Sequence, residues 1–162
     1  MKNVRNNNLN FTVRYICSKI KRIMIIQKFG GTSVGSPDRI RELAEITNGN
    51  ELKLVVLSAV AGTTNKLADI ASVVKNGYLS QALNRIYELR KEYEHFIHEL
   101  LPQKEFLLQG KQVIETAFSL IESLSISSFN PEHEKIILAQ GEIISTNLYH
   151  IYLNSIGKNS ML

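Results

Sequence analysis

The sequence predicts an α/β fold that opens with a strand, a helix and a second strand and then continues as helices. Two short apolar runs, residues 24–29 and 52–57, each end in a loop of small residues, and a segment with helical spacing separates them. From about residue 79 onward, apolar residues recur every three or four positions. With 162 residues, 44% of them hydrophobic, the chain is long enough to bury one core.

The first strand and the first helix are bounded by local signals. Residues 24–29 form an apolar run that ends at Gly30 and Gly31, which is typical of a buried strand followed by a backbone turn. Ser36 is a suitable N-cap and Pro37 suits the first position of a helix. The inner face of this helix is predicted to contain Ile40, Leu43, Ala44 and Thr47.

The second strand is predicted at residues 52–57. Its branched apolar residues point to both sides, as is typical of a parallel strand covered by helices on both faces. The order strand, helix, strand predicts a right-handed crossover. A loop of small residues follows at 58–64, and Asn65 is the predicted N-cap of a helix that ends before Gly77. The inner stripe of that helix is predicted to contain Leu67, Ala68, Ala71 and Val74.

The middle of the chain predicts an antiparallel helical hairpin. Apolar residues keep helical spacing over residues 79–100, Pro102 interrupts the pattern, and the spacing resumes over residues 106–124. A stripe this regular indicates core packing rather than a cofactor-binding surface.

The last helix is predicted to begin at Pro131, after a polar connection at residues 125–130, and to run to about Ile156. Gly141 lies inside this helix. Because glycine in a helix costs about 1 kcal/mol relative to alanine, we expect another part of the chain to approach its backbone closely.

The positive charge of the chain belongs to its first 23 residues. The net charge is +4, but residues 1–23 contain six Lys and Arg and no Asp or Glu, so they carry +6 and the remainder carries −2. Residues 24–162 therefore have no basic field that would indicate nucleic-acid binding. Three interpretations of this basic leader stay open: a start assigned too early, with Met24 as the true start, a basic arm, or a transit peptide. The first is favoured, no function is assigned to the leader, and it is expected to be disordered if it is translated.

Cys17 is the only cysteine, so no intrachain disulfide can form, and no apolar run reaches the roughly 20 residues that a membrane span requires. These observations favour a reducing compartment, with the cytoplasm as the expected location, and argue against a membrane or secreted protein.

Features of a phosphate-binding site follow the first strand. Lys28 adds a full positive charge at the strand end, and Gly30 and Gly31 lack Cβ atoms, so their backbone N–H groups can face a phosphate. The helix that begins near Ser36 adds partial positive charge. The spacing fits neither a P-loop nor a dinucleotide-binding loop. By itself the segment is equally compatible with a tight turn and an exposed lysine.

Two further segments carry polar groups that suit a substrate. Parallel strands place their following loops at one edge of a sheet, so the loop at 58–64 is expected beside the glycine turn. Its hydroxyls are equally compatible with a helix cap. Glu142, next to Gly141, is a candidate partner for a substrate ammonium group, although an ordinary solvated glutamate is the simpler interpretation of this residue taken alone. His95 and His98 lie three apart on a helix without an evident third ligand and are expected to be solvated.

Together these segments resemble the aspartate kinases, which have the amino-acid kinase fold. KFGGTSVGSP follows the first strand, VVLSAVAGTTNKL covers the second strand and its loop, and ILAQGEIISTN lies on the last helix, in the order typical of that family. The resemblance covers about residues 24–157. It implies a three-layer αβα fold of which residues 24–162 form the N-terminal portion, with the rest of the kinase domain and the ACT regulatory domains absent. It also implies a homo-oligomer for a full-length enzyme.

What the resemblance implies for activity is transfer of the γ-phosphoryl group of MgATP to the side-chain carboxylate of L-aspartate. The product is 4-phospho-L-aspartate, on the route to lysine, threonine and methionine. By resemblance, Lys28 is the catalytic residue that contacts the transferring group, Gly30 and Gly31 donate N–H groups to it, and Thr32 and Ser33 line the same phosphate pocket.

The resemblance also implies the aspartate contacts. Ser58 and Thr64 would contact aspartate and Glu142 would pair with its α-ammonium group. Mg²⁺ would be held largely by ATP phosphates and water, so no metal-ligating residue is predicted. Because the implied fold is incomplete, the alternative interpretation is a non-catalytic fragment that acts at most as an interaction module. In either case this chain alone is expected to be inactive.

Overall fold

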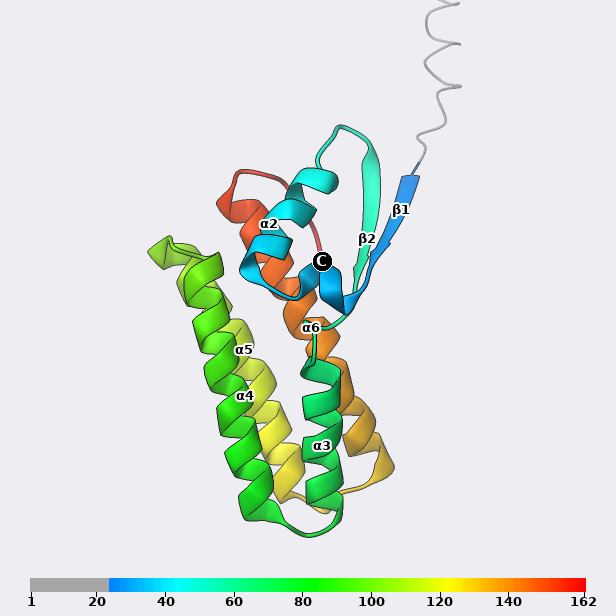
Figure 1. Cartoon of the computed structure of the whole chain (residues 1–162), viewed down its shortest axis with the longest axis vertical. Coiled ribbons are helices and arrows are strands. Elements are labelled where there is room, and N and C mark those ends of the chain that lie inside the picture. The colour runs from blue at the N-terminus through cyan, green and yellow to red at the C-terminus, as the bar shows by residue number, and fades with distance from the viewer. Residues whose placement is uncertain (1–23) are drawn as a thin grey trace, which may run out of the picture.

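The computed structural model describes residues 24–162 (Figure 1). The basic leader, with its predicted disorder, lies outside the described residues. In chain order the elements are β1 (Met24–Phe29), the 3-10 helix η1 (Gly31–Val34), α2 (Pro37–Ile46), β2 (Leu52–Leu57), α3 (Thr63–Lys75), α4 (Leu79–Leu100), α5 (Lys104–Ile126) and α6 (Pro131–Ser155).

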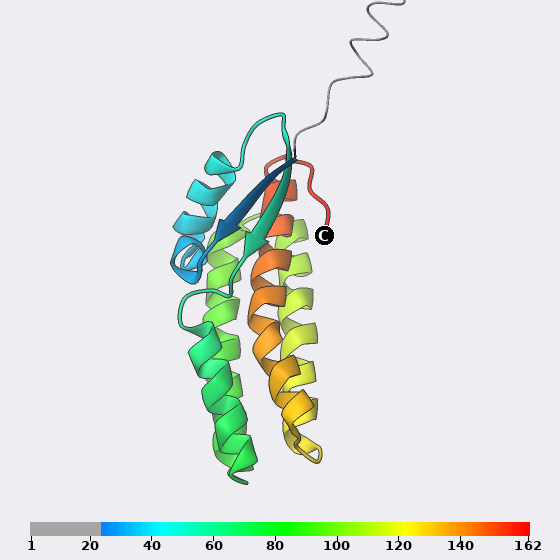
Figure 2. The same cartoon turned by 90° about the vertical axis from the view of Figure 1, so that its right-hand side faces the viewer.

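A small sheet lies at one end of a group of four long helices. Figures 1 and 2 show α3, α4, α5 and α6 running side by side, with β1, β2 and α2 gathered at their upper end. Helix α3 contacts both α4 and α6, and α5 contacts the same two helices, so the four close around a shared core. The predicted α/β class and the helical hairpin are confirmed. Among residues 24–162, no helix is both long and apolar enough to cross a lipid bilayer.

Strands β1 and β2 pair in parallel, with Met24 opposite Leu52 and Phe29 opposite Leu57, and both have the predicted bounds. The prediction that helices cover both faces is wrong for the residues that the structure describes. One face packs on the core, where Leu57 is 6% exposed, whereas Ile26 on the other face is 68% exposed. Apolar composition alone could not show this difference, because it records a residue's preference for burial and not the presence of a covering element.

Helix α2 is capped as predicted, since the Ser36 hydroxyl accepts a hydrogen bond from the Arg39 backbone N–H at 3.3 Å. Its predicted inner face is buried except at Thr47, which is half-buried. The Thr47 hydroxyl lies 2.5 Å from the hydroxyl of Tyr149 on α6. This pair joins α2 to α6 far from the loops that follow the strands.

Helix α3 begins two residues before the predicted cap at Asn65. Gly62 has a φ of 83°, a left-handed conformation that glycine adopts without a Cβ penalty, and the chain enters the helix directly from it. Thr64 is therefore a helical residue and not part of a loop. The predicted inner stripe is also partly wrong, because Ala68 is exposed and Ile70 is buried. Helix α3 packs between α4 and α6, and Ala68 lies on the face of the helix that points away from both.

The hairpin of α4 and α5 turns at residues 101–103, around the predicted interruption at Pro102. Helix α5 continues to Ile126, two residues into the predicted polar connection, and the buried Ser125 hydroxyl donates to the carbonyl of Ile121 at 2.7 Å. Helix α6 begins at Pro131 as predicted. The Asn130 side chain caps it by accepting hydrogen bonds from the next backbone N–H groups.

Candidate active site

The loops that follow the two strands lie against each other at the carboxyl edge of the sheet. The Ser58 backbone N–H donates to the carbonyl of Phe29 at 3.0 Å. A Cβ placed on Gly31 would lie 3.0 Å from the carbonyl oxygen of Ala59, and one on Gly35 would lie 3.2 Å from the Cβ of Ala61. Glycine is therefore needed at 31 because the second loop approaches so closely. The expected juxtaposition of the two loops is confirmed.

Helix α6 reaches the same loop. The Ser145 hydroxyl donates to the Ser58 carbonyl at 2.8 Å, and the Ala59 backbone N–H donates to the Glu142 carboxylate at 3.4 Å. A Cβ on Gly141 would lie 2.7 Å from the Cβ of Ala59, so the close approach predicted for this glycine is confirmed. The three segments with predicted site residues thus converge around Ala59.

The predicted phosphate-binding residues lie on β1 and η1. Lys28 is exposed and is aligned with Val56 across the strand pair, one residue before the Phe29 carbonyl that holds the second loop. A Cβ on Gly30 would meet open space, so a ligand could approach the backbone there. Thr32 is exposed.

Ser33 lies within η1, a 3-10 helix in the segment that the sequence predicted only as a turn. Its backbone N–H donates to the Gly30 carbonyl at 2.9 Å. That N–H is therefore used within the loop, and the Ser33 residue is half-buried.

The predicted aspartate contacts lie on the second loop, α3 and α6. Ser58 is half-buried, and Thr64 is exposed in the first turn of α3. Glu142 is exposed while its carboxylate accepts from the Ala59 N–H, so it is both oriented by the loop and open to a ligand.

Sequence reasoning missed a buried hydroxyl pair beside these groups. The Tyr93 and Thr63 hydroxyls lie 2.8 Å apart, and each residue is only 3% exposed. Burial raises the pKa of the Tyr93 phenol to about 12, and the nearby Glu142 carboxylate acts in the same direction. In the sequence Tyr93 belongs to a regular apolar stripe, and no signal in that stripe indicates a polar partner.

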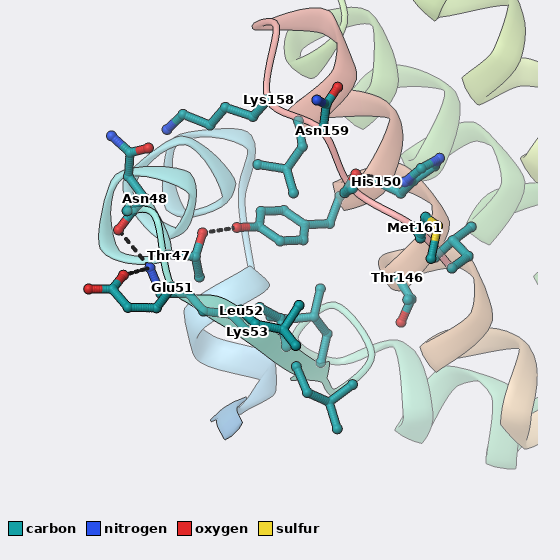
Figure 3. A pocket seen from close by; sticks show the side chains of 18 of the residues that line it. Thr47, Asn48, Glu51, Leu52, Lys53, Thr146, His150, Lys158, Asn159 and Met161 are labelled. Atoms are coloured by element: carbon teal, nitrogen blue, oxygen red, sulfur yellow. Dashed lines mark hydrogen bonds and ion pairs between the residues drawn. The ribbon is translucent and has the colours of Figure 1, made fainter. Parts of the chain in front are cut away.

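A large cavity lies elsewhere, at the amino end of β2 (Figure 3). Its volume is about 760 Å³, and it is bounded by β2, the second half of α6 and the last residues of the chain. Figure 3 shows Lys53 beside Asn48 and Glu51, to which it is joined at 2.8 and 3.1 Å. Because ligands of α/β sheets bind at the carboxyl ends of the strands, we do not assign the activity to this cavity.

Within the described part of the chain, no three His, Cys, Asp or Glu side chains are grouped as a metal site. His95 and His98 are exposed as expected, and the His95 ring lies 2.9 Å from the Glu99 carboxylate one turn later.

The comparison that decides the family covers nearly all of the described chain. Residues 24–161 match the amino acid kinase family. The chain belongs to this family. The predicted amino-acid kinase fold is thereby confirmed.

Curated relatives of this chain include aspartokinases, which confirms the resemblance predicted from the three segments. The chain is 30% identical over 144 residues to aspartokinase 2, chloroplastic, of Arabidopsis thaliana, which covers 85% of this chain and 26% of the relative. It is 31% identical over 133 residues to lysine-sensitive aspartokinase 3 of Escherichia coli K12, covering 78% and 27%. The chain thus spans about a quarter of the length of these curated relatives.

A solved structure gives the same result. The crystal structure of E. coli aspartokinase III in complex with lysine and aspartate superimposes with a TM-score of 0.68 at 26% identity, covering 86% of this chain and 30% of that one. The fold of this chain is therefore the fold of the corresponding part of an aspartokinase.

Proposed function

We propose that this chain carries the N-terminal part of an aspartokinase active site, which transfers the γ-phosphoryl group of MgATP to the side-chain carboxylate of L-aspartate. The observation that carries the proposal is the convergence of the glycine loop, the Ser58 loop and Glu142 around Ala59. The aspartokinase relatives, and the aspartate in the solved E. coli enzyme, support the choice of substrate.

The phosphate half of the proposed site is built on β1 and η1. ATP supplies the phosphoryl group that is transferred. Lys28 neutralises the charge of that group from the strand end, and the open space beside Gly30 lets its backbone approach the phosphate oxygens. Thr32 and Ser33 add hydroxyl donors, and Gly31 brings the second loop within reach.

The aspartate half is built on the Ser58 loop, α3 and α6. Thr64 and Ser58 bind the amino acid, and the Glu142 carboxylate pairs with its α-ammonium group. The reacting carboxylate of aspartate is already ionised at neutral pH, so no general base is required. Catalysis then consists of positioning and charge neutralisation, which this set of residues can supply.

Mg²⁺ in this proposal is held by the ATP phosphates and by water. Glu142 is committed to the Ala59 N–H and the substrate ammonium, and the described residues contain no group of three His, Cys, Asp or Glu side chains that could hold a metal ion. This donor set fits a magnesium ion that arrives with the nucleotide rather than one held by a protein cage.

The chain spans about a quarter of its relatives, so we propose that the groups that complete the site come from the segment that follows in aspartokinases. We expect residues 1–162 alone to show no turnover. Homo-oligomerisation, a cytoplasmic location and the place of the product before lysine, threonine and methionine remain predictions.

The test is a chimera in which residues 24–161 replace the matching segment of E. coli lysine-sensitive aspartokinase 3. Acyl phosphate is trapped with hydroxylamine. We expect hydroxamate that depends on both ATP and aspartate, and none when glutamate replaces aspartate. A chimera that folds by circular dichroism and binds ATP but forms no hydroxamate would contradict the proposal and favour the non-catalytic alternative.

A further inference from the structure

We propose that the hydroxyl pair of Tyr93 and Thr63 is a positioning device that fixes the first turn of α3 and with it the aspartate side of the site. The effect on aspartate binding rests on the proposed function. The fixing of the first turn of α3 rests only on the geometry of the pair. The pair joins the middle of α4 to the first residue of α3, 30 positions apart in the chain, at an oxygen to oxygen distance of 2.8 Å.

The tyrosine is held rigidly. Its ring makes an edge contact with Phe118 of α5, with centroids 5.9 Å apart, and a tilted contact with Phe96 at 6.3 Å. Aromatic contacts of this geometry restrict the ring, so its hydroxyl is presented from a fixed position. With a pKa of about 12 the phenol stays neutral at physiological pH and can donate or accept a hydrogen bond.

Thr63 is the point at which three helices meet. Its hydroxyl faces Tyr93 of α4, and its methyl carbon lies 3.3 Å from the place that a Cβ on Gly141 of α6 would occupy. The hydrogen bond therefore selects the threonine rotamer that turns the methyl group toward α6. Without Tyr93, the Thr63 hydroxyl would be buried without this partner, and this favours a change of rotamer or a shift of the helix start.

A shift at Thr63 would reach the proposed substrate groups directly. The next residue, Thr64, is the exposed hydroxyl assigned to aspartate. The Thr63 N–H donates to the carbonyl of Val60 at 3.0 Å, so the loop that carries Ala59 turns tightly into α3. Ala59 and Thr63 both pack on Gly141, and the Ala59 N–H orients Glu142. The helical hairpin thus has a role at the site besides building the core.

The first experiment measures amide hydrogen exchange in the chain of residues 1–162. In Tyr93→Phe we expect amides of residues 58–64 to exchange faster by on the order of tenfold relative to those of α5. Thr63→Ser keeps the hydroxyl and should give a much smaller change in these amides. The matched control is Tyr149→Phe, which breaks the similar pair with Thr47 farther along α6 and should leave residues 58–64 unchanged.

The result that overturns the positioning role is an unchanged exchange rate at 58–64 in Tyr93→Phe, or an equal acceleration throughout the chain. If Tyr93→Phe does not fold, Thr63→Val takes its place, because it removes the other hydroxyl of the same pair and must give the same local pattern.

The second experiment uses the chimera with the E. coli enzyme. Tyr93→Phe should raise the KM for aspartate several-fold while kcat and the KM for MgATP stay within about twofold. Thr63→Ser should restore most of the aspartate affinity that Thr63→Val loses. A fall in kcat without a change in KM would overturn the role at the aspartate side. A parent chimera without activity would contradict the proposed function, and the exchange measurement would then decide the positioning role by itself.

Discussion

Gly141 of α6 lies directly against Ala59, so closely that a Cβ on the glycine would stand 2.7 Å from the alanine Cβ. We predict that Gly141→Ala lowers the free energy of unfolding by about 1 to 3 kcal/mol, measured by urea denaturation. The gain of about 1 kcal/mol in helix propensity is included in this net loss. The clash dominates because a Cβ is fixed to its backbone, so either α6 or the loop must move.

Gly110 of α5 provides the control for this substitution. A Cβ there would lie 2.8 Å from Cδ1 of Leu101, which is the far end of a flexible side chain. Gly110→Ala should therefore be less destabilising than Gly141→Ala. An equal or larger loss at 110 would show that the approach of the loop to α6 is not the cause.

The order of the elements and the three converging segments could be predicted because their signals are local. Gly30, Ser36 and Pro131 mark boundaries through the conformations and hydrogen bonds of single residues, and the structure confirms those boundaries. Gly141 could be identified as a contact point because a helical glycine is unfavourable without one. The identity of its partner, Ala59, follows from the fold and not from the glycine.

The remaining features depend on contacts between distant residues. Asn65 and Gly62 both suit a helix start, and the structure begins α3 at the turn of Gly62, where Thr63 meets Tyr93 of α4 and Gly141 of α6. The pairing of Tyr93 with Thr63 joins positions that share no pattern in the sequence. The exposure of one face of the sheet could not be predicted either, since its residues are as apolar as those of a covered strand.

We predict that shortening a side chain on one face of β2 destabilises the fold much more than shortening one on the other face. Leu57 is 6% exposed and packs in the core, so Leu57→Ala should lower the free energy of unfolding by about 2 to 4 kcal/mol. Leu54 is 49% exposed on the opposite face, so Leu54→Ala should change it by about 0.5 kcal/mol or less. Urea unfolding of both variants of the 1–162 chain checks this, and similar losses at the two positions would contradict the one-sided burial of the sheet.

The buried phenol of Tyr93 predicts a loss of stability at high pH. Its pKa is about 12 in the folded chain against an ordinary value of 10.0, so the folded state holds the proton more tightly than the unfolded state. The stabilisation is complete below pH 10 and is lost as the pH rises from 10 to 12, by on the order of 2 kcal/mol in total. Urea midpoints between pH 8 and pH 11.5 should therefore decline, and Tyr93→Phe should flatten the decline.

A second buried tyrosine contributes to this measurement. Burial also raises the pKa of Tyr149, so some decline should remain in Tyr93→Phe and should diminish further when Tyr149→Phe is added. A slope that Tyr93→Phe does not alter would mean that the phenol is not buried as described.

We predict that replacing Lys28 lowers turnover without lowering the stability of the fold. Because the side chain is exposed, Lys28→Ala should change the free energy of unfolding by about 0.5 kcal/mol or less. In the chimera with the E. coli enzyme it should lower kcat by roughly 10²-fold or more, since the charge that it supplies acts on the transferring phosphoryl group. Lys75→Ala, at the last turn of α3, is the control and should leave kcat unchanged.

We predict that removing the charge of Glu142 has the complementary effect, a weaker binding of aspartate with little change in turnover. Glu142→Gln keeps an oxygen that can accept the Ala59 N–H but removes the negative charge, so the loop should hold its position while the pairing with the substrate ammonium weakens. We expect the KM for aspartate to rise by on the order of tenfold with little change in kcat, and Glu134→Gln in the first turn of the same helix to have no effect. If Glu142→Gln instead reduced kcat at saturating aspartate, and Lys28→Ala raised only the KM for aspartate, the two residues would have to exchange the roles assigned to them.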